Sequence, residues 1–174
     1  MGRGALSGRT AIVVGAGTGV GAAVSLALSR AGAGVVLAAR PDPALTALAA
    51  GIVAAGGQAV AAPVDVGDPS AVRRLVERTL GVFGRLDIAF NQVHARALVV
   101  AMTYQIAAMR VTGGGHIVNL VPAAQDGVAE LTRTVARAHA GSVVRIDAVS
   151  QAPYGSTEEV AAAVVSLCSA AGPA

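Results

Sequence analysis

Short apolar runs rich in valine alternate with longer amphipathic runs along this chain of 174 residues. The short runs have the length and β-branched content of strands buried on both faces. The longer runs repeat apolar residues at the spacing of helices that pack on one side. Six strand–helix units in series predict an α/β fold: a doubly wound parallel sheet of about six strands with helices on both faces.

The periodicity assigns a residue range to each element. Strands are predicted at residues 11–14, 35–39, 59–63, 86–90, 116–120 and 143–149. Helices are predicted at residues 19–31, 43–55, 69–83, 97–111, 123–140 and 157–170. Asp68 followed by Pro69 marks the start of the third helix, because the pair combines an N-cap residue with the helical position that proline prefers. The length predicts a single domain over residues 1–174.

The composition limits the classes of function. The chain is 54% hydrophobic and 13% charged, which supplies a core of small side chains. Its net charge is only +3, all 13 basic residues are arginine, and aromatic residues make up 2%. Nucleic-acid surfaces combine basic patches with aromatic residues for stacking, so we expect no nucleic-acid partner. The single Cys168 lies in an apolar helical run, and a buried free thiol fits a reducing, cytoplasmic compartment.

An uncharged stretch between Arg9 and Arg30 has the length of a signal peptide or a membrane span. Four of its residues are glycine, and they follow a short apolar run, where a spanning helix would need continuity. We therefore expect no membrane segment here.

The glycines of this stretch form the segment "VVGAGTGVGAA", where a predicted strand turns into a helix. Gly15, Gly17, Gly19 and Gly21 would let the backbone approach a pyrophosphate, whose charge meets the positive end of the helix. Together with Val20 in the same run, they are the predicted phosphate-binding residues.

The second strand ends in "VVLAAR", which puts Arg40 where the adenosine ribose of a dinucleotide would lie. A guanidinium offers a planar donor fork to a 2′-phosphate, whereas an acidic residue would bind the ribose hydroxyls. Arg40 therefore favours NADP(H) over NAD(H) as the cofactor.

These segments, in this order, resemble the short-chain dehydrogenase/reductase family: Gly15-x-x-x-Gly19-x-Gly21, "VVLAAR", "PVDVGDPSAVRRLVERTLGVFGRLDIAFN", "GGGHIVN" and "LTRTVAR". The resemblance implies a Rossmann-like dinucleotide-binding domain and oxidoreductase descent. It also implies that Asp65 accepts from the adenine amino group and that Val66 flanks the base. Asn91 would open the family's Asn-Asn-Ala-Gly segment.

The chain departs from the family pattern where the chemistry should lie. Gln92, Val93 and His94 follow Asn91 in place of Asn-Ala-Gly, and Val14 replaces the usual threonine. The family's catalytic serine, tyrosine and lysine should follow "IVN". Aligning the helix that comes next instead puts Val121 at the tyrosine position and Gln125 at the lysine position, with Pro122 between them. The chain contains no lysine, so the usual pair of a phenol and an ammonium cannot form.

Two classes of function remain open. The first is an NADP(H)-binding protein with a degenerate active site that serves as a binding or partner subunit. The alternative is an enzyme that uses the same crevice for cyclisation, dehydration or reduction of a small-molecule substrate, with His94 or Tyr104 as the acid or base. The three histidines lack metal-ligand spacing, so no metal site is predicted.

The fourth predicted helix carries an apolar stripe that a shortened sheet would leave partly uncovered. We therefore expect a homo-oligomer. The stripe consists of Leu98, Val99, Met102, Ile106 and Met109.

Overall fold

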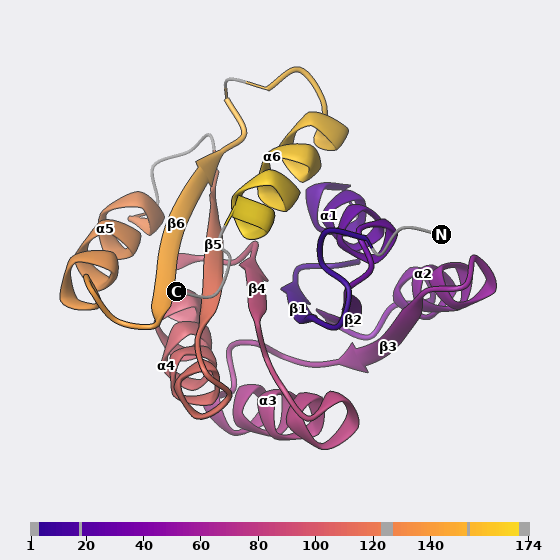
Figure 1. Cartoon of the computed structure of the whole chain (residues 1–174), viewed down its shortest axis with the longest axis horizontal. Coiled ribbons are helices and arrows are strands. Elements are labelled where there is room, and N and C mark those ends of the chain that lie inside the picture. Colours follow the sequence, from indigo (N-terminus) through magenta and orange to yellow (C-terminus); the bar gives the residue numbers. More distant parts are fainter. Residues whose placement is uncertain (1–3, 18, 123–126, 153, 171–174) are drawn as a thin grey trace.

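The computed structural model of the protein describes residues 4–17, 19–122, 127–152 and 154–170. Its strands are β1 (Thr10–Val14), β2 (Gly34–Ala39), β3 (Gln58–Pro63), β4 (Ile88–Asn91), β5 (Gly115–Val121) and β6 (Val144–Ser150). Its helices are α1 (Gly19–Arg30), α2 (Pro43–Ala54), α3 (Pro69–Phe83), α4 (Ala95–Val111), α5 (Val128–Ala138) and α6 (Thr157–Ala170). All strand pairs are parallel, in the order β3-β2-β1-β4-β5-β6 (Figure 1). The predicted fold class is confirmed.

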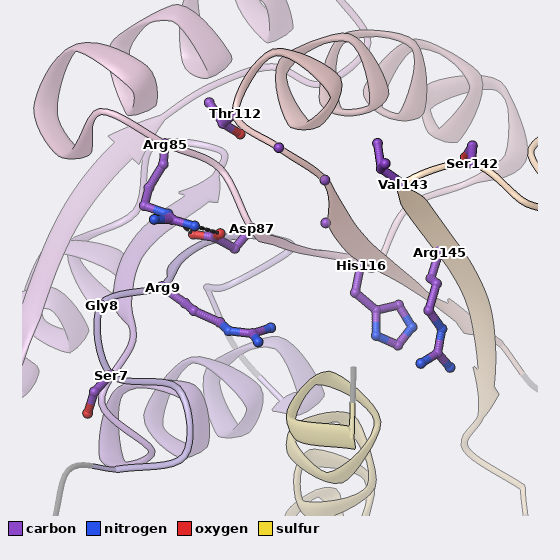
Figure 2. Close-up of a pocket in the computed structure, with 13 residues that line it drawn as sticks. Ser7, Gly8, Arg9, Arg85, Asp87, Thr112, His116, Ser142, Val143 and Arg145 are labelled. Atoms are coloured by element: carbon purple, nitrogen blue, oxygen red, sulfur yellow. Dashed lines mark hydrogen bonds and ion pairs between the residues drawn. The ribbon is translucent and has the colours of Figure 1, made fainter. Parts of the chain in front are cut away.

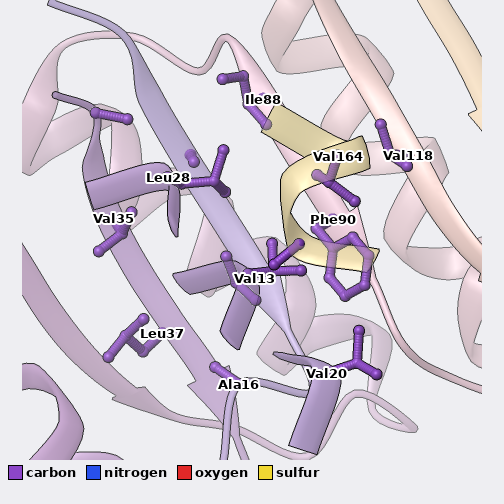
Figure 3. Packing of buried hydrophobic residues seen from close by; sticks show 14 of the residues in the cluster. Val13, Ala16, Val20, Leu28, Val35, Leu37, Ile88, Phe90, Val118 and Val164 are labelled. Carbon is purple, nitrogen blue, oxygen red and sulfur yellow. The ribbon is translucent and has the colours of Figure 1, made fainter. Parts of the chain in front are cut away.

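Two apolar layers sandwich the sheet. In the first layer, α1, α2 and α6 cover one face of the sheet. In the second layer, α3, α4 and α5 cover the other face. Successive side chains of a strand point to opposite faces, so Val13 packs in the first layer and Val14 in the second. Figure 3 shows Val13, Phe90 and Val164 within the first layer. In the described part of the chain, no helix combines the length and hydropathy that a membrane span requires.

Several element boundaries agree with their sequence signals. The carboxylate of Asp68 accepts from the backbone N–H of Ser70 over 2.9 Å, and Pro69 opens α3 as predicted. Gly84 ends this helix in the left-handed region at φ 76°. The predicted ranges 69–83 and 157–170 are those of α3 and α6. These boundaries depend on neighbours in sequence, which is why a local pattern locates them.

Other boundaries differ. β4 begins at Ile88, two residues later than predicted, because the carboxylate of Asp87 turns back to accept from the backbone N–H of Thr10 over 2.8 Å. α4 begins at Ala95 rather than 97, with the carbonyl of His94 accepting from the N–H of Leu98 over 3.0 Å. α5 begins at Val128, and the predicted start at 123 falls in 123–126, outside the described residues.

The apolar stripe of α4 is covered within the chain. The homo-oligomer was expected because a shortened sheet would leave this stripe partly uncovered, and the structure contradicts that reason. Val99 is 49% exposed, but the other four residues pack against the sheet in the second layer. The sheet covers the stripe because β4, β5 and β6 all lie on the α4 side of β1. The fully covered residues are Leu98, Met102, Ile106 and Met109.

The strand order reverses at β1, which pairs with β2 on one side and β4 on the other. Connections from β1 and β4 leave the sheet in opposite directions there, which opens a crevice at the carboxyl ends of the two strands. The glycine loop after β1 and the Gln92–His94 segment after β4 therefore lie next to this crevice.

Candidate functional site

The glycine loop connects β1 to α1 in conformations that suit glycine. Gly15 has φ 86° and Gly19 has φ 58°, both in the left-handed region. The N–H of Gly15 donates to the carbonyl of Ala38 over 2.8 Å, which ties the loop to the end of β2. The loop therefore holds a tight turn directly before the N-terminus of α1, as an anion-binding loop does.

Gly21 lets the first turn of α1 approach the loop. A Cβ at this position would lie 2.0 Å from the carbonyl oxygen of Gly15, so no side chain fits. Gly17 is different, since a Cβ there would make an ordinary contact of 3.6 Å with Ala39. The side chain of Val20 is buried in the first layer. Hence Val20, predicted to bind the cofactor, could do so only through its backbone.

Gln92 contacts the same loop. Its side-chain oxygen Oε1 accepts from the backbone N–H of Gly21 over 3.0 Å. Its backbone oxygen and Cβ lie so close to Gly15 that a Cβ on that glycine would be 2.8 and 2.9 Å away. Sequence reasoning treated Gln92 only as a departure from the family pattern. Its contact with the loop follows from the pairing of β4 with β1, which places the ends of the two strands side by side.

The adenosine-side residues lie at the same edge of the sheet. Arg40 follows β2, is exposed, and forms no hydrogen bond or ion pair with another described residue. Asp65 follows β3, is exposed, and its carboxylate accepts from the N–H of Gly67 over 2.9 Å. Val66 is half-buried against the second layer. The guanidinium of Arg40 is thus available to a ligand beside the loop.

Asn91 takes a structural role. Its side chain is 1% exposed and forms an amide pair with Gln105, with distances of 2.9 Å from Asn91 Nδ2 to Gln105 Oε1 and 2.8 Å from Gln105 Nε2 to Asn91 Oδ1. Asn91 Nδ2 also donates to Asn119 over 2.9 Å, and Asn119 in turn donates to Thr132 over 3.1 Å. This chain of buried polar groups joins β4, α4, β5 and α5. The side chain of Asn91, predicted to bind the cofactor, is therefore engaged inside the fold.

The two candidate acid–base residues do not converge. His94 is exposed at the N-cap of α4, beside the crevice. Tyr104 lies ten residues further along this helix, or about 15 Å along its axis. Its side chain is half-buried against the second layer. The other tyrosine, Tyr154, is half-buried against the first layer.

The remaining histidines lie elsewhere. His116 is buried near the start of β5, at the amino edge of the sheet, and His139 ends α5 with Nδ1 2.9 Å from the carbonyl oxygen of Val135. Within the described ranges, no group of three or more His, Cys, Asp or Glu side chains could hold a metal ion. Gln125, aligned with the family's lysine, lies outside the described residues.

The sequence also matches a known protein family. The family model described as short chain dehydrogenase matches residues 9–144. The chain belongs to the short-chain dehydrogenase family. Members of this family bind a nicotinamide dinucleotide, so the glycine loop of this short-chain dehydrogenase lies where that cofactor's pyrophosphate is expected.

Solved structures of other short-chain dehydrogenases share the fold. A metagenomic short-chain oxidoreductase in complex with NADP superposes with a TM-score of 0.86 at 26% identity, over 95% of this chain and 92% of that one. A short-chain type dehydrogenase/reductase from Mycobacterium marinum gives a TM-score of 0.86 at 27% identity, over 95% and 90% of the two chains.

Curated relatives match in sequence over part of their length. An uncharacterized oxidoreductase of Mycobacterium tuberculosis is 40% identical over 88 residues, which are 51% of this chain and 34% of that protein. Cyclohexanol dehydrogenase of Acinetobacter sp. is 28% identical over 178 residues, 81% of this chain and 71% of that protein. This short-chain dehydrogenase therefore spans about a third of the length of the first relative.

Proposed function

We propose that the protein binds NADP(H) at the carboxyl edge of its sheet and serves as a binding or partner subunit that has lost the family's proton relay. The observation that carries the proposal is the glycine loop. Gly15 and Gly19 are in the left-handed region, and Gly21 has no space for a Cβ. These features let the backbone approach a pyrophosphate at the N-terminus of α1.

The preference for NADP(H) over NAD(H) rests on Arg40. Its exposed guanidinium at the end of β2 would pair with the 2′-phosphate, while Asp65 and Val66 would contact the adenine. A charge-assisted pair contributes about 1.5 to 3 kcal/mol, or roughly tenfold to a hundredfold in affinity. The NADP complex of the structurally similar metagenomic protein supports this choice.

The loss of the relay rests on side-chain chemistry. The 174 residues include no lysine that could lower the pKa of a phenol. Val121, the last residue of the strand that should lead to the catalytic serine, and Pro122 after it carry no hydroxyl group. Tyr104 and Tyr154 pack on opposite faces of the sheet. Losing a general acid costs about 10² to 10⁴ in rate, and losing the donor that polarises the carbonyl costs roughly another 10² to 10³.

Cofactor titration tests the binding proposal. Calorimetry with NADPH and NADH should give a preference of about tenfold to a hundredfold for NADPH, and Arg40→Ala should remove most of it. Arg73→Ala is the control, because Arg73 is also an exposed arginine and lies on α3, distant in sequence from the glycine loop. Equal affinities of the unaltered protein for both cofactors would refute the assignment to Arg40.

A turnover assay tests the loss of the relay and the alternative function. NADPH oxidation is followed with ketones, aldehydes and quinones, including cyclohexanone because one relative is a cyclohexanol dehydrogenase. We expect background rates. Ordinary turnover on any substrate would contradict the proposal, and its loss in His94→Ala or Tyr104→Phe would identify the replacement acid. Product formation without cofactor would instead indicate cyclisation or dehydration.

Three further expectations remain predictions: a single domain, a cytoplasmic location and a homo-oligomer. The apolar stripe of α4 does not support an oligomer, because only Val99 of that stripe is substantially exposed. Light scattering at micromolar concentration distinguishes a monomer from an oligomer.

A further inference from the structure

Gln92, the first residue after β4, lies against the start of the glycine loop. Its backbone N–H donates to the carbonyl of Val14, at the end of β1, over 3.0 Å. Its carbonyl oxygen and Cβ are so near Gly15 that a Cβ on that glycine would be 2.8 and 2.9 Å from them. The main chain of Gln92 is therefore fixed beside the loop, while its side chain is exposed.

The side chain of Gln92 reaches the other end of the loop. Its Oε1 accepts from the backbone N–H of Gly21 over 3.0 Å. The carbonyl of Gly21 accepts in turn from Oγ of the buried Ser25 over 2.8 Å. Gln92 thus contacts both Gly15, where the loop begins, and Gly21, in the first turn of α1. One residue from another strand therefore holds the two ends of the loop together.

This arrangement leaves backbone donors for a pyrophosphate. The N–H groups in the first turn of a helix have no acceptor within the helix. Of Gly19, Val20 and Gly21, only Gly21 donates to an acceptor among the described residues, and that acceptor is the neutral amide of Gln92. The other two N–H groups remain for an anion, which would also meet the positive end of α1. A loop already held in its binding conformation loses less entropy when the ligand binds.

We propose that Gln92 is a positioning residue for the dinucleotide, an inference that rests on the proposed binding of NADP(H) at this loop. Its amide holds the loop so that the N–H groups of Gly19 and Val20 are available to the pyrophosphate, and its neutrality is part of this role. A carboxylate at the same position would accept more strongly from the N–H of Gly21, but it would repel the pyrophosphate. A change of charge at residue 92 should therefore move stability and affinity in opposite directions.

Gln92→Glu tests this opposition. The new carboxylate lies at the N-terminus of α1, so the melting temperature should rise by about 1 to 4 °C. Calorimetric titration with NADPH should show an affinity about tenfold lower, because like charges meet beside the loop. Adenosine 2′-monophosphate carries the adenine and the 2′-phosphate but no pyrophosphate. Its affinity, measured by NMR titration, should therefore change by less than about twofold.

Two further variants separate the hydrogen bond from the charge. Gln92→Met removes the hydrogen bond to Gly21 and adds no charge, so NADPH binding should weaken about threefold and the melting temperature should fall slightly. Gln58→Glu is the control for added charge, because Gln58 is an exposed glutamine at the start of β3, at the opposite edge of the sheet. It should leave NADPH affinity unchanged.

A different location of the dinucleotide would give a different result. A hollow of about 450 Å³ lies at the amino edge of the sheet, where its lining includes the ion pair of Arg85 and Asp87 (Figure 2). A dinucleotide bound in this hollow would not respond to Gln92→Glu, and Arg85→Gln would weaken its binding instead. That pair of results would overturn the proposal.

Three other results would also overturn it. In the first, Gln92→Glu binds NADPH as tightly as the unaltered protein does. In the second, Gln92→Glu loses as much affinity for adenosine 2′-monophosphate as for NADPH. In the third, weaker NADPH binding comes with a lower melting temperature, which indicates damage to the fold alone. Failure of the unaltered protein to bind NADPH is a separate result, which overturns the proposed function and this inference with it.

Discussion

Replacing Asn91 should reveal that the buried amide pair stabilises the fold. Asn91→Leu keeps the side-chain volume close to the original and removes three hydrogen bonds, two to Gln105 and one to Asn119. It leaves both polar groups of the Gln105 amide and the oxygen of Asn119 unpaired at sites no more than 1% exposed. Each buried, unpaired group costs about 1 to 3 kcal/mol, so the three groups together should lower the unfolding free energy by about 3 to 9 kcal/mol.

A double-mutant cycle with Gln105→Met isolates the pair. Gln105→Met alone leaves Oδ1 of Asn91 without a partner, while Nδ2 of Asn91 still donates to Asn119. The double variant removes both amides together and leaves only the oxygen of Asn119 unpaired. The double variant should therefore lose about 2 kcal/mol less than the sum of the single variants.

Urea unfolding followed by far-UV circular dichroism measures these free energies, since the chain has no tryptophan. Gln151→Met, at an exposed position after β6, is the control and should change stability by less than about 0.5 kcal/mol. Additive single variants, or a loss below about 1 kcal/mol in Asn91→Leu, would refute the structural role of Asn91.

Three further predictions concern glycine packing, thiol reactivity and pH. Gly21→Ala should lower the melting temperature and abolish cofactor binding, because the added Cβ would overlap the Gly15 carbonyl. As the control, Gly51→Ala inside α2 places its Cβ where nothing lies within 4 Å, so it should stabilise the protein by about 0.5 to 1 kcal/mol. Calorimetric melting compares the two variants. Burial raises the pKa of Cys168 to about 12, so a thiol reagent at pH 8 should label only the unfolded chain, and rapid labelling of native protein would contradict this. Burial lowers the pKa of His116 below its ordinary 6.5, so the unfolded chain takes up this proton at a higher pH than the folded protein does. The unfolding free energy should therefore fall as the pH drops below about 7, and urea unfolding should show a smaller fall in His116→Gln.

The sequence alone located the elements, since helix starts and strand lengths depend on residues a few positions apart. Asp68 and Pro69 are sufficient to begin α3, because an N-cap acts on a backbone N–H two residues ahead. The alternation of strands and helices was also sufficient for the α/β class. The glycine spacing between strand and helix also predicted the glycine loop, whose left-handed Gly15 and Gly19 agree with the demands of a tight turn.

Only the tertiary structure decided which side chains face the crevice and which face the core. Asn91 carries no local signal of burial, and it became internal because of the elements that pack beside it. Gln92 meets the glycine loop because β4 pairs with β1, although the two strands are more than seventy residues apart. His116 likewise meets Asp147 because β6 pairs with β5. Periodicity indicates on which side of its own helix or strand a residue lies. These contacts depend instead on which elements become neighbours, and the packing of the whole sheet determines that.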